Sequence, residues 1–74
     1  MRYWVKSHLR AEHTDSIVTA KRLCVEHIKT LKAQGFGYCV WWAKLRDLEK
    51  NRECLLYCGR DGRFHTSRWH EIFM

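Results

Sequence analysis

Proline is absent from this chain, and glycine is scarce, with four residues among 74. No Ser/Gly/Pro-rich or repeated stretch marks an internal linker, so the sequence predicts a single compact domain over residues 1–74. No apolar run approaches the ~20 residues that a membrane span requires. The charged first residues do not resemble a secretory signal. We therefore expect no membrane partner and a cytoplasmic location, which would be the host cytoplasm if the protein is phage-encoded.

The cysteines lack the CxxC spacing that makes a zinc site recognisable. Disulfides would require a secreted context, which the sequence does not indicate. Buried free thiols are therefore expected, and we predict no metal and no cofactor. A metal site or disulfides remain the alternatives. Two candidate ligand sets are Cys24, His27, Cys39, Cys54 and Cys58, or Cys54, Cys58, His65 and His70.

Nucleotide-binding motifs are also missing, since neither GxGxxG nor a P-loop occurs. One stretch near the C-terminus, RFHTSRWHE, collects residue types used in acid–base catalysis, namely His65, Ser67, His70 and Glu71. Their spacing fixes no mutual geometry, and such residues also serve on a wet surface or against phosphate. We expect a protein that is not an enzyme.

Positive charge is in excess. The chain has 14 Lys and Arg against eight Asp and Glu, which gives a net charge of +6. Such a balance favours an anionic partner, whether nucleic acid, a nucleoprotein or an acidic protein surface. Ordinary solubility charge is the alternative, and the position of the charges in the fold decides between the two.

Two periodicities divide the first half of the chain. Residues 2–10 alternate with period two and predict a strand. A polar connection over 11–16 follows, with helix N-cap candidates Thr14, Asp15 and Ser16. Apolar residues then recur at a period of 3.6, which predicts a helix from about 16 to 34 that ends at Gly35.

The second half predicts strands. The Asp61-Gly62 pair is typical of a hairpin turn, and the tail over 67–74 fits either a strand or a helical turn. A second helix over 42–50 is the alternative to part of the second strand. The predicted order is β-α-β-β-β, an α+β fold of two layers in which one helix packs on one face of a mostly antiparallel four-stranded sheet. The last three predicted strands cover about 36–46, 53–58 and a segment starting near 63.

Trp41 and Trp42 are adjacent, so in a strand they must point to opposite faces of the sheet. One helix can cover only one of these faces. The alternation that stays apolar throughout is predicted to lie under the helix, and it comprises Tyr3, Val5, Leu9, Cys39, Trp41, Ala43, Leu45, Cys54, Leu56 and Cys58. Aromatic residues with basic neighbours occupy the other alternation. Those we predict to bind a partner are Trp4, Lys6, Arg10, Tyr38, Trp42, Lys44, Arg46 and Tyr57.

Two alternatives would cover this aromatic face. The C-terminal residues Trp69, Ile72 and Phe73 could fold over it, or a second copy could pack on it, so the functional unit is either a monomer or a homodimer. If the face stays uncovered, it has the composition of a protein-binding surface. We then expect a small basic protein that occupies a surface of a protein or nucleoprotein complex, similar in size and character to phage or mobile-element inhibitors such as anti-CRISPR proteins. Direct RNA or DNA binding, with bases stacked on the aromatic rings, is the other hypothesis.

Overall fold

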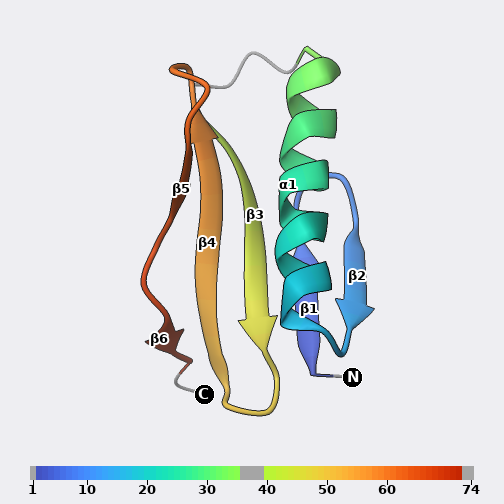
Figure 1. The fold of residues 1–74 in the computed structure, drawn as a ribbon, viewed down its shortest axis with the longest axis vertical. Coiled ribbons are helices and arrows are strands. Elements are labelled where there is room, and N and C mark those ends of the chain that lie inside the picture. Colours follow the sequence, from blue (N-terminus) through green and yellow to red (C-terminus); the bar gives the residue numbers. More distant parts are fainter. Residues whose placement is uncertain (1, 36–39, 73–74) are drawn as a thin grey trace.

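A computed structural model describes residues 2–35 and 40–72, and in these residues one helix packs against an antiparallel sheet (Figure 1). The sheet order is β2-β1-β3-β4-β5, with β6 also paired to β4. The predicted α+β class is confirmed, although the sheet has more strands than the four we expected. The elements are β1 (Tyr3–Lys6), β2 (Ala11–Thr14), α1 (Ile17–Ala33), β3 (Val40–Asp47), β4 (Arg52–Gly59), β5 (Phe64–Thr66) and β6 (His70–Glu71).

The N-terminal segment is a hairpin, whereas the sequence predicted one strand over 2–10. β1 ends at Lys6, and the chain turns back where the backbone N–H of Ser7 donates to the carbonyl of Arg10 at 3.1 Å. The predicted polar connection is mostly the strand β2, which lies at the edge of the sheet. An edge strand needs a partner on one side only, so its polar side chains can remain in contact with water.

The helix agrees with the prediction. Ser16 is the N-cap, and its hydroxyl accepts a hydrogen bond from the backbone N–H of Thr19 at 3.3 Å. Gly35 follows the helix with a φ of +75°, a conformation that glycine adopts without the steric cost that other residues incur. Residues on the inner face of the helix are buried, namely Ala20, Cys24, His27, Ile28 and Leu31.

The hairpin of β3 and β4 is the centre of the sheet. Strand β3 pairs with β1 on one side and with β4 on the other, so the alternative of a second helix over 42–50 is wrong. The end of β3 and both ends of β4 lie within one residue of the limits predicted for these strands. Residues 36–39 of the predicted second strand lie outside the described residues.

The C-terminal segment is extended. Gly62, with a φ of +79°, closes the turn after β4, and β5 and β6 then pair one after the other with the same edge of β4. This rules out the helical turn for the tail as far as Ile72. The indole of Trp69 packs against the core on the helix side, and the backbone N–H of Ile72 donates to the carbonyl of Asn51 at 3.0 Å. The described tail therefore runs along the sheet edge and does not cover the face opposite the helix.

The core lies between α1 and the sheet, as predicted. Its buried apolar residues are Tyr3, Val5, Ala20, Cys24, Ile28, Leu31, Ala43, Leu45, Cys54 and Cys58. Of the other residues predicted inward, Leu9, Trp41 and Leu56 are half-buried, and Cys39 lies outside the described residues. The described helix is not long and apolar enough to cross a membrane.

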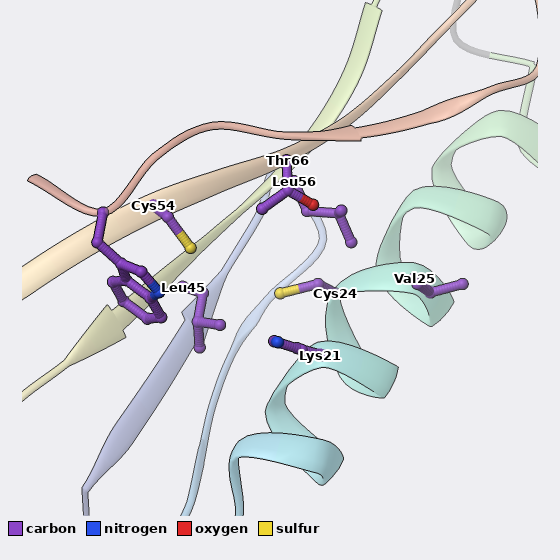
Figure 2. Close-up of a pocket in the computed structure, with 8 residues that line it drawn as sticks. Lys21, Cys24, Val25, Leu45, Cys54, Leu56 and Thr66 are labelled. Atoms are coloured by element: carbon purple, nitrogen blue, oxygen red, sulfur yellow. The ribbon is translucent and has the colours of Figure 1, made fainter.

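The helix lies nearer to β1 and β3 than to β5 and β6 (Figure 1). A pocket with a volume of about 320 Å³ consequently remains between α1 and the C-terminal strands (Figure 2). Its lining residues are Lys21, Cys24, Val25, Leu45, Cys54, Leu56, Thr66 and Trp69.

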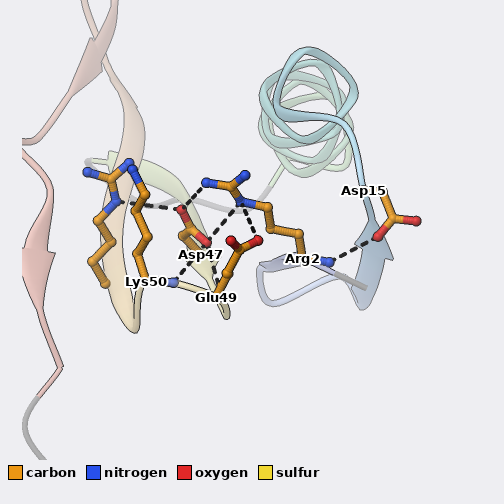
Figure 3. A network of polar contacts seen from close by, with 6 residues as sticks. Arg2, Asp15, Asp47, Glu49 and Lys50 are labelled. Carbon is orange, nitrogen blue, oxygen red and sulfur yellow. Dashed lines mark hydrogen bonds and ion pairs between the residues drawn. The ribbon is translucent and has the colours of Figure 1, made fainter.

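One carboxylate is fully buried, that of Asp47 at the end of β3 (Figure 3). Arg2 donates to it from Nε at 3.3 Å and from Nη2 at 3.4 Å, and the Nε of Arg52 lies 3.6 Å away. The backbone N–H groups of Glu49 and Lys50 donate to the same carboxylate. Asp47 thereby joins the segment before β1, the strand β4 and the β3–β4 turn, and it fixes their relative positions.

Candidate binding surface

The strand register brings the outward-pointing side chains together on the face opposite α1. Trp4 lies opposite both His13 and Arg46, and Trp42 lies opposite Tyr57. We refer to this surface as the open face and define it by Trp4, Lys6, His13, Trp42, Lys44, Arg46, Leu55, Tyr57 and His65.

The first aromatic centre of the open face is Trp4, which is half-buried. The guanidinium carbon of Arg46 lies 5.0 Å from the centroid of the Trp4 ring, and Nζ of Lys6 lies 5.6 Å from it. Cations at such distances over an indole are attracted by the negative ring face. Trp4 is therefore held in position by charged neighbours instead of being buried under apolar ones.

The second aromatic centre is Trp42 on β3. The ring of His8 meets it edge-on, with the two centroids 4.9 Å apart. Tyr57 lies opposite Trp42 on β4 and stacks on His65 of β5 at a centroid distance of 5.3 Å. These contacts order the rings and leave them half-buried or exposed, as an aromatic binding surface requires.

Lys6 and Lys44 lie directly opposite each other on β1 and β3, between the two aromatic centres. Like charges in this position destabilise a sheet. Among the described residues, no carboxylate lies within ion-pair distance of either lysine, so the repulsion is not offset by a salt bridge. An anionic group of a partner placed between the two lysines would relieve it.

Glu53 lies directly opposite Arg46 on β4, so this acidic residue is on the same side of the sheet as the open face. Arg46 donates to its carboxylate at 3.2 Å, and His70 lies 3.5 Å from it. Burial opposes ionisation of Glu53, but the hydrogen bond from Arg46 and the nearby positive charges outweigh it and lower the pKa of Glu53. The open face therefore presents net positive charge.

Six of the eight residues predicted to bind a partner share the open face, namely Trp4, Lys6, Trp42, Lys44, Arg46 and Tyr57. Arg10 does not lie on a strand. It lies in the β1–β2 turn, where its Nε pairs with Glu12 at 3.1 Å. Tyr38 lies outside the described residues. His13 and His65 were missed, although the alternation in the stretch AEHT, residues 11–14, could have indicated the first of them.

A buried polar cluster holds the helix on the other side of the sheet. His27 is fully buried, its Nδ1 lies 2.7 Å from the hydroxyl of Ser7, and its Nε2 lies 2.8 Å from the carboxylate of Glu12. The hydrogen bond with His27, followed by that from Arg10, lowers the pKa of Glu12. Serine, histidine and a carboxylate also form catalytic triads, but Ser7 is only 5 % exposed and its hydroxyl accepts from the backbone N–H of Leu9. The cluster satisfies a buried histidine.

Within residues 2–35 and 40–72, no group of three or more His, Cys, Asp or Glu could hold a metal ion, and Cys39 lies outside these ranges. Cys24, Cys54 and Cys58 are free and buried. Ser67, from the stretch RFHTSRWHE, accepts a hydrogen bond from the backbone N–H of Leu55. Its hydroxyl therefore supports the sheet edge.

No protein-family model, curated protein or solved structure matches this chain significantly.

Proposed function

We propose that this protein is a non-enzymatic binding protein that acts by occupying a surface of a macromolecular partner with its open face. One observation carries the proposal. Trp4 and Trp42 lie on the same helix-free face of the sheet. Between them lie Lys6 and Lys44, which form no ion pair within the part of the chain that the structure describes. Trp, Tyr and Arg are the residue types that most often dominate the binding energy of protein interfaces.

In this mechanism the aromatic rings provide the apolar contacts with the partner, and the cations determine how the partner is positioned on the open face. Trp42 and Tyr57 provide apolar area at low entropic cost, because their rings are already ordered by contacts with His8 and His65. Lys6 and Lys44 pair with carboxylates or phosphates of the target. The partner surface therefore has an apolar groove or ridge with acidic groups beside it.

Small size, net positive charge and the lack of catalytic motifs fit an inhibitor that blocks a host nucleoprotein complex, of the phage or mobile-element type exemplified by anti-CRISPR proteins. This part of the proposal is an analogy of size and character. A basic inhibitor of this kind would bind an acidic site on the target, or would also contact its nucleic acid.

Direct nucleic-acid binding is the second candidate, and the lysine pair favours it. Bases could stack on Trp4 and Trp42 while Lys6 and Lys44 contact the intervening phosphates. Both candidates use the same residues, so mutation of the open face alone does not separate them.

The test is affinity capture from lysate of the source cell, with and without nuclease, using the wild type, Trp42→Ala and Arg22→Ala. Arg22 is exposed on the helix, away from the open face, and serves as the control. The proposal expects a specific protein or nucleoprotein that is retained by the wild type and Arg22→Ala and lost by Trp42→Ala. Capture that is indifferent to Trp42→Ala would contradict it.

Titration of generic single-stranded RNA and DNA oligomers at several salt concentrations separates the candidates. Tight binding that falls steeply with salt and is lost in Trp42→Ala would favour direct nucleic-acid binding. Sedimentation of the free protein tests the remaining alternative, because a dimer that dissociates in Trp42→Ala would assign the open face to self-association.

A further inference from the structure

The pocket between α1 and the C-terminal strands is separate from the open face, since its residues lie on the helix side of the sheet. Lys21 and Cys24 extend into it from the helix, and Leu45 and Cys54 face them from β3 and β4 (Figure 2). Its volume of about 320 Å³ is near the lower end of the ~300–1,000 Å³ that ligand pockets span. Such a space accepts one slim aliphatic chain or one ring system.

The walls of the pocket are mainly apolar. Leu45 and Cys54 are buried, and Val25, Leu56 and Trp69 are half-buried, so part of their apolar surface remains exposed to solvent. The thiols add no reactivity, because burial raises the pKa of Cys24 to about 12 and also raises that of Cys54. Protonated thiols behave as small apolar groups.

Trp69 lines the pocket, and its indole contacts an arginine of β4. The guanidinium carbon of Arg52 lies 4.5 Å from the centroid of its ring, and the Nε of the same arginine pairs with the buried Asp47 at 3.6 Å. Arg52 therefore places the Trp69 indole while its own charge is already balanced. The pocket wall is preformed, which lowers the entropic cost of binding.

Lys21 is different, because none of the ion pairs among the described residues involves it. Among the described residues, no carboxylate lies within ion-pair distance of its ammonium group. Its positive charge acts on the Cys54 thiol across the pocket, where it opposes the effect of burial. A single unpaired cation beside apolar walls is complementary to a ligand that carries one negative charge at the end of an apolar body.

We propose that this pocket binds a small amphipathic carboxylate of the medium-chain fatty-acid class. The apolar chain lies against Leu45, Leu56 and the Trp69 indole, and the carboxylate pairs with the ammonium group of Lys21. This site does not depend on the open face, and the binding protein proposed above would carry it in addition to its macromolecular partner.

The test uses decanoate as the probe, at concentrations below its micelle-forming range, and follows backbone and indole N–H signals by two-dimensional NMR. The proposal expects saturable shifts for Trp69 and for residues of α1 around Lys21, with no saturable shifts for Trp4 or Trp42. Decanol, which lacks the charge, should bind at least fivefold more weakly.

Two variants and one control assign the contacts. Lys21→Gln should weaken decanoate binding at least fivefold and leave decanol binding unchanged. Lys29→Gln removes the same charge from an exposed helical position that does not line the pocket, and it should bind decanoate as the wild type does. Val25→Phe should reduce the space available and weaken both ligands, with the wild-type fold checked by circular dichroism.

Three results would overturn this proposal without affecting the open face. These are the absence of saturable shifts, equal affinity for decanoate and decanol, and equal losses in Lys21→Gln and Lys29→Gln. Saturable shifts confined to Trp4 and Trp42 would also overturn it, because they would move the ligand to the opposite side of the sheet.

Discussion

Arg46 and Trp4 form a cross-strand pair in which the guanidinium carbon of Arg46 lies 5.0 Å from the centroid of the Trp4 ring. Nη2 of the same arginine donates to Glu53 at 3.2 Å. Arg46 thus links β1, β3 and β4 on the open face. Its side chain contributes both to the stability of the sheet and to the positive charge of the surface.

Replacing Arg46 with alanine should therefore cost stability as well as binding. We expect Arg46→Ala to lower the free energy of unfolding by about 1 kcal/mol, because a half-exposed cation–π contact and an ion pair are lost together. Urea denaturation measures the change. Lys6→Ala is the control, since Lys6 contacts the same ring at 5.6 Å but is exposed and has no ion pair among the described residues. An equal loss in the two variants would contradict the assigned role of Arg46.

Acid should destabilise the protein through Asp47. Burial opposes its ionisation, but the hydrogen bond from Arg2, the attraction of that arginine and the backbone N–H donors outweigh this effect and lower the pKa of Asp47. A carboxyl whose folded pKa lies below its unfolded value of about 3.9 contributes its full stability above that pH. This contribution is lost as the pH falls through the folded pKa.

We expect Asp47→Asn to lose about 3 kcal/mol at pH 7, because Arg52 would lose the carboxylate it pairs with and Arg2 would keep only its partly exposed ion pair with Glu49. Its thermal midpoint should also vary less than that of the wild type between pH 5 and about pH 2. Parallel pH profiles of the two proteins would show that Asp47 is not the group responsible.

The buried histidine should depend on Ser7. Ser7→Ala removes the group that lies 2.7 Å from Nδ1 of His27, so we expect a loss of about 1–2 kcal/mol from an unsatisfied buried nitrogen. Thr30→Ala deletes an exposed hydroxyl on the same helix and should be neutral or slightly stabilising. Chemical denaturation of both variants gives the comparison. A Ser7→Ala protein as stable as the wild type would mean that water replaces the serine hydroxyl.

Thiol labelling tests the packing of the core. In the native protein at pH 8, Cys24, Cys54 and Cys58 should resist a disulfide-exchange reagent, because all three are buried and the pKa of Cys24 is raised to about 12. The same thiols should react at once in urea. Peptide mapping by mass spectrometry separates them from Cys39. Rapid labelling of Cys24 under native conditions would contradict this expectation, because it would show that the reagent reaches the thiol through the pocket or through local opening of the helix.

The sequence predicts the central elements of this protein well, because each central element has one apolar and one polar side. Trp41 and Trp42 are adjacent and lie on opposite faces of β3, as the alternation indicates. The strand β2 was not predicted, since Glu12 on its inner side is matched by a buried histidine and the apolar alternation is lost. The burial of Asp47 could not be predicted from the sequence either, because it depends on Arg2, which is 45 residues away along the chain.

The order of strands in the sheet also has a consequence for folding kinetics. The pairs β1–β2, β3–β4 and β4–β5 are hairpins, which close quickly because their strands are neighbours in the sequence. Among the described strand pairs, β1 with β3 joins the two most distant segments and carries the largest loop-closure entropy. We expect this pairing to be completed in the rate-limiting step. Val5 lies on β1 opposite Leu45 of β3, so the φ-value of Val5→Ala measures how far the pairing has formed in the transition state. Trp4 meets Arg46 only across this junction, and the first aromatic centre is therefore assembled when the two halves of the sheet join.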